Sequence, residues 1–277
     1  MRILAGKTVL LTGASGGLGA HMAHAFARQK VKLALVAHPG IDLEGLRKSI
    51  AAEGVQAAAL TSDLRDPVQR RELLKDVRSQ LGPIDILINN AGVEFNAAYH
   101  DLSEGQIGEV LSVNLEAPMI LSRLVLPEMI ERRQGHIVNI SSLAGKCGPA
   151  FQEPYAATKA GLVAFTQSLR ATYRGSGVSA SVVVPAFVEA GIYARLKAKT
   201  GCAAPRLLTG SSPAQVARAV LRSIEDDVPE IIVSRYPLRP VLALAALSPR
   251  LGDWITTRIG VHEFFRRAVE AEKRDRS

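Results

Sequence analysis

A glycine-rich turn near the N-terminus constrains the fold of this chain more than any other feature. Residues 12–19 read T-G-A-S-G-G-L-G and follow a short apolar stretch, residues 7–11, that predicts a buried strand. A helix-forming stretch, residues 20–29, comes directly after the turn. Glycine permits tight turns and close approach of the backbone to a ligand, and the free N–H groups of a helix N-terminus attract phosphate. Strand, glycine turn and helix in this order predict a dinucleotide-binding loop.

Strand-like apolar segments alternate with helical patterns along the rest of the chain. Further strands are predicted at residues 31–37, 55–60, 84–89, 136–140, 178–184 and 230–233. Helices are predicted at residues 42–53, 68–80, 103–113 and 115–133, and one begins near Pro154. Because the strands are nearly continuous apolar runs, they indicate a parallel sheet that is buried on both faces. The expected fold class is α/β: a three-layer, Rossmann-type, doubly wound parallel sheet of about seven strands with helices on both faces and a helical C-terminal extension.

Length and composition indicate a single globular domain over residues 1–277. The chain is 47% hydrophobic and 22% charged, with a formal net charge of +8. Its lysines and arginines are spread along the sequence without a basic stripe that alternates with aromatic residues, so nucleic-acid binding is not expected. Cys147 and Cys202 have no metal-ligand spacing and suggest no disulfide framework, so no metal site is expected. With no signal-peptide pattern at the start, the predicted location is the cytoplasm.

A tyrosine and a lysine in the middle of the chain indicate proton transfer. Tyr155 and Lys159 are four residues apart on a predicted helix and therefore share one face. A lysine ammonium beside a phenol favours the phenolate, which predicts a Tyr155 pKa below the usual value of about 10. Ser142 precedes the tyrosine by thirteen positions and can hold a carbonyl or alcohol oxygen beside the phenol. The pair alone is common by chance, so the interpretation depends on its combination with the glycine turn.

Five motifs in one register make the chain resemble the short-chain dehydrogenase/reductase family. These are the glycine turn, N-N-A-G at residues 89–92, V-N-L around Asn114, I-V-N-I-S-S ending at Ser142, and the Tyr155–Lys159 pair. The resemblance spans residues from about 5 to about 190. It implies an NAD(P)(H)-dependent oxidoreductase that interconverts a ketone and a secondary alcohol on a small-molecule substrate. It also makes a homodimer or homotetramer the expected assembly.

The resemblance implies a role for each site residue. Tyr155 would be the general acid in reduction and the base in oxidation, and Lys159 would lower its pKa and bind the nicotinamide ribose. Ser142 would orient the substrate oxygen; Ser141 is its rival, but the thirteen-residue interval favours Ser142. Asn114 would hold a water that completes a proton path through Lys159. The implied cofactor-binding set comprises Gly13, Ser15, Gly16, Gly17, Leu18, Gly19, Ala37, His38, Asp63, Leu64, Asn90, Ala91, Gly92, Tyr155, Lys159, Pro185 and Val188.

The end of the second strand bears on the choice of cofactor. NAD users place an acid there for the ribose 2′-hydroxyl, whereas this chain has Ala37 followed by His38. The small alanine leaves room for a 2′-phosphate, and His38 can carry positive charge, so NADP(H) is favoured with NAD(H) as the alternative. The chain departs from the family pattern after Pro185, where Ala186 replaces a glycine and Ala190 replaces a threonine that bonds the nicotinamide carboxamide. Backbone groups near Val188 are expected to take over that contact.

Two segments toward the C-terminus are less constrained by the pattern. Residues 186–210 have no clear period and are expected to form a substrate lid, whose basic residues are either solvated or a clamp for an anionic group: Arg195, Lys197, Lys199 and Arg206. The C-terminal extension, residues 237–277, contains an apolar run that is too short to span a bilayer. We expect its apolar residues Leu242, Leu244, Leu247, Trp254, Phe264 and Phe265 to pack on another subunit, to roof a pocket for a lipophilic acyl, steroid-like or polyketide-like substrate, or to lie peripherally on a membrane surface.

Two other functional classes remain as alternatives. A non-catalytic dinucleotide-binding regulator would share the glycine turn, but the complete serine, tyrosine and lysine set argues against it. A nucleotide-sugar epimerase or dehydratase would share much of the pattern, but those related chains carry a larger C-terminal substrate domain.

Overall fold

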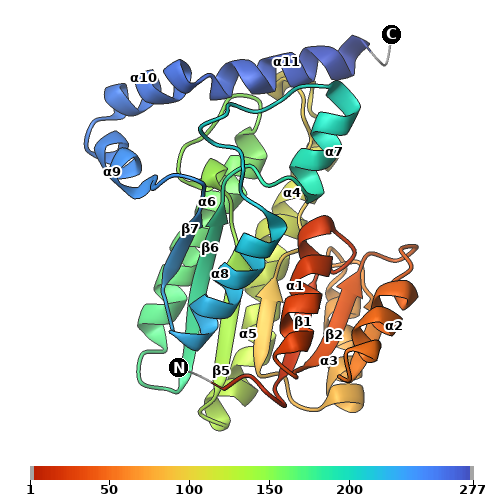
Figure 1. The fold of residues 1–277 in the computed structure, drawn as a ribbon. Helices are drawn as coiled ribbons and strands as arrows, with labels where there is room; N and C mark the ends of the chain where they lie inside the picture. The colour runs from red at the N-terminus through yellow and green to blue at the C-terminus, as the bar shows by residue number, and fades with distance from the viewer. Residues whose placement is uncertain (1–2, 275–277) are drawn as a thin grey trace.

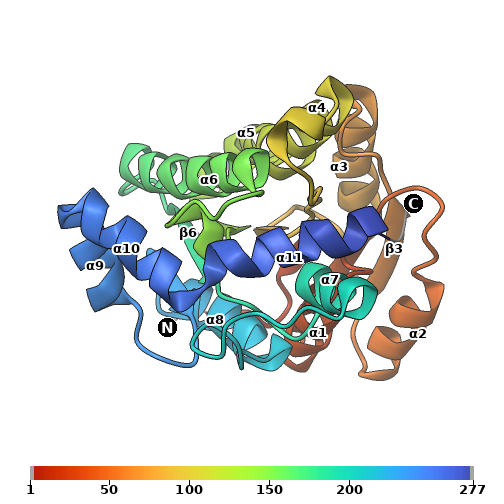
Figure 2. The ribbon, with the colours of Figure 1, turned by 90° about the horizontal axis from the view of Figure 1, so that it is seen from above.

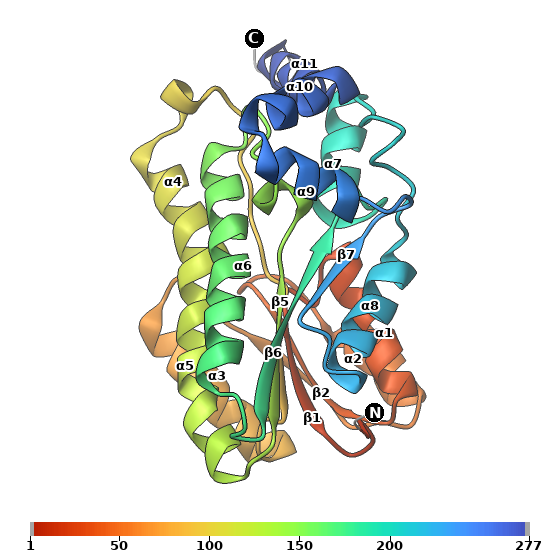
Figure 3. The same cartoon turned by 90° about the vertical axis from the view of Figure 1, so that its left-hand side faces the viewer.

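Seven parallel strands form one twisted sheet at the centre of the molecule (Figures 1 and 3). The computed structural model describes residues 3–274. The strand order is β3-β2-β1-β4-β5-β6-β7, so the order reverses between β1 and β4. Open α/β sheets bind ligands at such a reversal, beyond the carboxyl ends of the strands. The strands are β1 (Thr8–Thr12), β2 (Lys32–Ala37), β3 (Ala57–Thr61), β4 (Ile86–Asn89), β5 (Gly135–Ile140), β6 (Val178–Pro185) and β7 (Glu230–Val233).

Helices cover both faces of the sheet, which confirms the predicted fold class (Figure 3). One face carries α1 (Gly17–Arg28), α2 (Glu44–Ala52) and α8 (Pro213–Glu225). The other carries α3 (Pro67–Leu81), α4 (Glu104–Leu111), α5 (Ala117–Glu131) and α6 (Glu153–Thr172). Each face has its own hydrophobic core. Met22 and Phe26 of α1 are almost fully buried in the first core, and Leu74 of α3 and Leu121 of α5 in the second. Helix α8 was not predicted from the sequence, although a capping box of Ser212 and Gln215 marks its start.

A π turn joins α4 and α5 into one continuous helix where two separate helices were predicted. The turn, η2 (Ser112–Glu116), contains the buried Asn114. A π turn inserts one extra residue into an α-helix and is often found at functional sites. By length and composition the whole helix, Glu104–Glu131, could cross a membrane. A single helix of this kind is weak evidence, because the core helix of a soluble protein passes the same test; 44% of its most apolar window is buried in the protein.

The C-terminal helices form a roof over the carboxyl edge of the sheet. Figure 2 shows α11 (Val261–Arg274) running across that edge beside α7 (Gly191–Thr200), while α9 (Arg239–Leu247) and α10 (Pro249–Ile259) lie to one side. Phe264 and Phe265 of α11 pack against Phe187 and Tyr193 in an aromatic cluster. The segment predicted to lack regular structure therefore contains a helix, α7, which pairs with α11.

Two ion pairs fasten the far end of this roof. Lys273 Nζ lies 2.8 Å from Asp101 Oδ2 in the short turn η1 (Tyr99–Asp101). Lys199 Nζ of α7 lies 3.2 Å from Glu272 Oε2. Because these contacts join α11 to α7 and to the chain after β4, the roof is held at both walls of the cleft below it.

The apolar residues of the C-terminal extension separate into two groups. Phe264 is buried in the roof, and Leu242 packs against the same cluster. Leu244, Leu247 and Trp254 are instead 51%, 84% and 61% exposed on α9 and α10. The pocket-roof alternative thus accounts for the first group, and among residues 3–274 the second group is largely left exposed.

Candidate active site

A cleft of about 600 Å³ lies at the carboxyl ends of the strands, beneath α7 and α11. It begins at the reversal between β1 and β4 and extends to the aromatic cluster of the roof. Every residue of the predicted cofactor set lines it, as do Ser142, Tyr155 and Lys159. Asn114 is the one predicted site residue that does not. The structure therefore brings together residues that are up to 175 positions apart, from Gly13 to Val188.

The glycine turn is packed so tightly that side chains are excluded at three positions, Gly13, Gly17 and Gly19. Gly13 has a φ of +65°, and a Cβ there would lie 2.8 Å from Ala91 Cα. A Cβ on Gly19 would lie 2.2 Å from the Gly13 carbonyl oxygen. The close neighbour of Gly19 is thus the turn itself. Helix α1 begins at Gly17, so its free N–H groups face the cleft where a pyrophosphate would bind.

Thr12 and Asn90 hold this turn against the end of β4. The Asn90 side-chain amide donates hydrogen bonds to the carbonyl oxygens of Thr12 and Gly13, both at 3.0 Å. Thr12 Oγ1 accepts from the backbone N–H groups of Asn90 and Ala91 and donates to the Ile88 carbonyl. These bonds join the two strands on either side of the reversal, so they fix the width of the cleft where the turn meets it.

The far end of the cleft is lined by residues at the ends of β2 and β3. Ala37 is buried, and His38 follows it with Nε2 3.8 Å from Asp63 Oδ2. Arg65 makes a close ion pair with Asp63 at 2.7 Å, and this hydrogen-bonded guanidinium lowers the Asp63 pKa to about 2. Arg65 also lines the cleft but was missed by the sequence analysis, because no spacing rule marks an arginine after a third strand.

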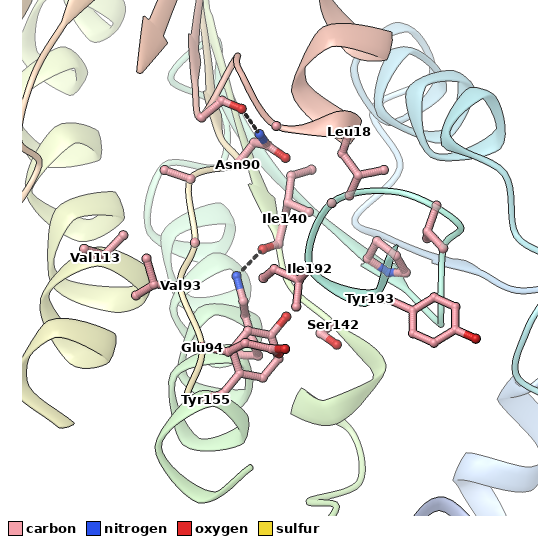
Figure 4. Close-up of a pocket in the computed structure, with 18 of the residues that line it drawn as sticks. Leu18, Asn90, Val93, Glu94, Val113, Ile140, Ser142, Tyr155, Ile192 and Tyr193 are labelled. Carbon is pink, nitrogen blue, oxygen red and sulfur yellow. Dashed lines mark hydrogen bonds between the residues drawn. The ribbon is translucent and has the colours of Figure 1, made fainter. Parts of the chain in front are cut away.

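Ser142, Tyr155 and Lys159 meet in the middle of the cleft (Figure 4). The Ser142 hydroxyl lies beside the Tyr155 phenol, and Lys159 Nζ lies 5.5 Å from the Tyr155 ring centre. Lys159 Nζ donates to the Ile140 carbonyl at 3.0 Å. Ser141 points elsewhere: its hydroxyl donates to the Lys159 backbone carbonyl at 2.7 Å. The two neighbouring serines therefore contact different partners, one at the phenol and one at the backbone of α6.

The Tyr155 pKa is shifted in the direction opposite to the prediction. Burial raises it well above its usual value, the Glu94 carboxylate raises it further, and only the hydrogen bond from Ser142 lowers it. Burial also lowers the Lys159 pKa to about 8. The sequence prediction was wrong because helical spacing shows that two side chains share a face, but not how strongly that face is desolvated.

Asn114 stands behind the cleft wall. Its side chain is fully buried, accepts from the Val93 N–H and donates to the Val93 carbonyl, both at 2.8 Å. This two-way contact shapes the chain directly after N-N-A-G. The role that the family resemblance gives it in a proton path stays a prediction.

The opposite end of the cleft is mostly apolar. Its lining includes Leu143, Phe187, Ile192, Tyr193, Leu196, Leu208, Val261 and Phe265. Of the lid's four basic residues, Arg195 lines the cleft and Arg206 does not, while Lys197 pairs with Glu189 and Lys199 with Glu272. Glu94 and Gln152 also line it and were missed by the sequence analysis, since neither belongs to a recognisable motif.

Comparisons with known proteins agree with this geometry. The family model of the short chain dehydrogenases matches residues 7–201. A ketoacyl reductase, HetN of Nostoc sp., is 39% identical over 99% of this chain and 96% of its own. The structure is also similar to a metagenomic short-chain oxidoreductase in complex with NADP (TM-score 0.72, 29% identity, 84% of this chain and 98% of that one). A variant of the actinorhodin polyketide ketoreductase with NADPH gives a TM-score of 0.77 at 27% identity, with the same coverage.

These relatives bind a nicotinamide dinucleotide in the fold that the present chain adopts, and the glycine turn of this chain has the cradle that such a cofactor requires. We conclude that the chain belongs to the short-chain dehydrogenase/reductase family, whose members are NAD(P)-dependent enzymes acting on CH–OH and C=O groups.

Proposed function

We propose that this enzyme uses NADPH to reduce a ketone on a lipophilic, acyl-like or polyketide-like substrate to a secondary alcohol. The observation that carries the proposal is the meeting of the Ser142 hydroxyl and the Tyr155 phenol beside Lys159, below an apolar roof. The similarity to a ketoacyl reductase and to a polyketide ketoreductase supports the substrate class.

The residues of the cleft divide the proton chemistry between them. When bound, the reduced nicotinamide supplies the hydride that the carbonyl carbon accepts. Ser142 donates a hydrogen bond to the carbonyl oxygen, which stabilises the negative charge that develops there. Tyr155 transfers its phenolic proton to that oxygen, which completes the alcohol. The high Tyr155 pKa keeps the phenol protonated at neutral pH, as an acid in the reductive direction must be.

Lys159 would neutralise the phenolate that proton transfer leaves behind. Its ammonium is buried beside the Tyr155 ring and held by the Ile140 carbonyl. In a desolvated site this charge favours the phenolate more strongly than it would in water. Lys159 thus acts after the proton has left, which is consistent with a phenol that is neutral beforehand.

The preference for NADPH rests on the end of β2. A 2′-phosphate would meet no carboxylate at Ala37, and the imidazole of His38 is more than half exposed beside it. Arg65, whose guanidinium is 43% exposed at the same end of the cleft, offers a second cation. An NAD-selective site would carry an acid where Ala37 stands.

A panel of carbonyl compounds tests the proposal. The pure enzyme is incubated with NADPH or NADH and with medium-chain ketones, acyl thioesters carrying a β-keto group, and sugars, and cofactor oxidation is followed. We expect turnover of the ketones or β-keto thioesters with NADPH, and none with the same protein carrying Tyr155→Phe. Equal turnover by the Tyr155→Phe protein, or reduction of sugars alone, would contradict the proposal.

A further inference from the structure

An acidic side chain lies among the reacting residues without a part in the proposed chemistry. Glu94 follows N-N-A-G at the end of β4 and lines the cleft together with Ser142 and Tyr155. Figure 4 shows it beside Tyr155, and its carboxylate acts electrostatically on both Tyr155 and Lys159. It therefore adjoins the place where a substrate carbonyl must sit.

Two amides orient this carboxylate. Gln152 Nε2 donates to Asn96 Oδ1 at 2.7 Å, and Asn96 Nδ2 donates to Glu94 Oε1 at 3.2 Å. Because each of these hydrogen bonds points from Gln152 toward Glu94, an acceptor is left free at each end of the series. Gln152 Oε1 is buried without a hydrogen-bond partner, and within residues 3–274 the carboxylate receives hydrogen bonds only from Asn96.

The free Gln152 acceptor is unfavourable for the fold by itself, whereas the part-buried Glu94 carboxylate opens into the cleft. A buried acceptor without a donor costs free energy, because it has given up its bonds to water. Burial likewise raises the Glu94 pKa to about 7, with the Glu272 carboxylate adding to the effect and Asn96, Arg195 and Lys159 opposing it. Arrangements that cost stability persist most often at binding and catalytic sites.

We propose that Glu94, held in place by Asn96 and Gln152, accepts a hydrogen bond from a hydroxyl or N–H group that the substrate carries next to its carbonyl carbon. This inference rests on the proposed ketone reduction and names the substrate more closely. The position fits, because the carbonyl oxygen must lie at Ser142 and Tyr155, which leaves its neighbouring carbon beside Glu94.

The remaining lining at the substrate end of the cleft restricts the chemistry of the other half of the substrate. Apart from Glu94, Gln152 and Arg195, the lining beyond Ser142 and Tyr155 is apolar and ends at Phe265 of the roof. A substrate that satisfies both ends has a polar donor beside its carbonyl and an apolar remainder. A simple alkyl ketone would leave the carboxylate buried and unpaired, which is a strong basis for rejecting it.

Three ketones of one chain length test the inference: a long-chain methyl ketone, its α-hydroxy derivative and the methyl ether of that derivative. The ether keeps the oxygen and the size but removes the donor. For the wild-type enzyme we expect the hydroxy ketone to exceed the other two in kcat/KM by about 10- to 100-fold, as for hydrogen bonds to charged groups. In Glu94→Leu this preference should fall to about twofold, chiefly through a higher KM for the hydroxy ketone.

Glu94→Gln is the matched variant, since it keeps the size and one acceptor oxygen, and it should retain part of the preference. It also carries the test if Glu94→Leu does not fold. Equal losses of turnover on all three ketones in Glu94→Gln would overturn the inference, because they would assign Glu94 to the chemistry itself. A wild-type enzyme that reduces the ketones without preferring the hydroxyl would overturn it too. If the wild type reduces none of them while binding NADPH, the proposed reaction fails, and the inference falls with it.

Discussion

The two adjacent serines allow stability and catalysis to be separated by single substitutions. Ser141 is 4% exposed and donates its only side-chain hydrogen bond to the Lys159 carbonyl inside α6. Removing a buried neutral hydrogen bond of this kind costs about 1 kcal/mol. In a protein of this size that corresponds to a fall of about 2–3 °C in Tm. Ser141→Ala should therefore melt earlier but turn over substrate at nearly the wild-type rate.

Ser142→Ala should behave in the opposite way. Its hydroxyl accepts from the Ala144 N–H and lies beside the Tyr155 phenol, at the edge of the cleft rather than in the core. Loss of one donor to a developing oxyanion lowers kcat by about 100- to 1000-fold, which is about 3–4 kcal/mol of transition-state stabilisation. The accompanying change in Tm should be smaller than that of Ser141→Ala.

The assay is steady-state NADPH oxidation with the best ketone of the panel, combined with thermal denaturation of the same preparations. Each variant serves as the control for the other, because both remove one hydroxyl from neighbouring positions. If Ser141→Ala loses more turnover than Ser142→Ala, the assignment of the substrate oxygen to Ser142 is wrong.

Three further predictions follow from the charges and the exposed surface. Ala37→Asp should shift the preference from NADPH toward NADH, since a carboxylate there repels a 2′-phosphate; an unchanged ratio of kcat/KM for the two cofactors would contradict this. The raised Glu94 pKa means that wild-type stability falls as pH rises from about 4.5 to about 7. The free energy of unfolding of Glu94→Gln should therefore rise relative to that of wild type by up to about 3 kcal/mol across that window and stay higher above it. A Tm difference between variant and wild type that is the same at pH 5 and at pH 8 would refute this. Exposed Leu247 and Trp254, with Arg250 and Arg258 nearby, should make the enzyme co-sediment with phosphatidylglycerol vesicles at low salt, less so at high salt, and not when both apolar residues are changed to Glu; wild-type protein that stays in the supernatant at low salt would disprove this.

The cofactor half of the cleft could be predicted from the sequence because each of its parts has a local pattern. The glycine turn lies between a strand and a helix, and Tyr155 and Lys159 lie one helical turn apart. Both patterns depend only on residues that are close in the sequence, so they can be recognised without knowing the fold. Helix α7 was missed because it buries only Tyr193 and Leu196, too few apolar positions to produce a visible period.

The substrate half could not be predicted, because its chemistry arises from contacts between distant segments. Glu94 gains its role from Asn96 and from Gln152, 58 positions further on, and no spacing within the chain joins them. The electrostatics of Tyr155 were mispredicted for the same reason. Its pKa is governed by burial and by Glu94, neither of which helical spacing reveals.

The way α11 is fastened has a practical consequence for handling the protein. The last turn of this helix is joined to both walls of the cleft through Lys273 and Glu272, so this turn is part of the frame of the substrate chamber. An affinity tag or fusion partner attached directly after this turn would disturb the chamber, whereas β1, the first strand, starts at the opposite end of the sheet (Figure 1). Conversely, exchanging the final helices between related enzymes offers a route to new substrate ranges that leaves the phosphate-binding turn untouched.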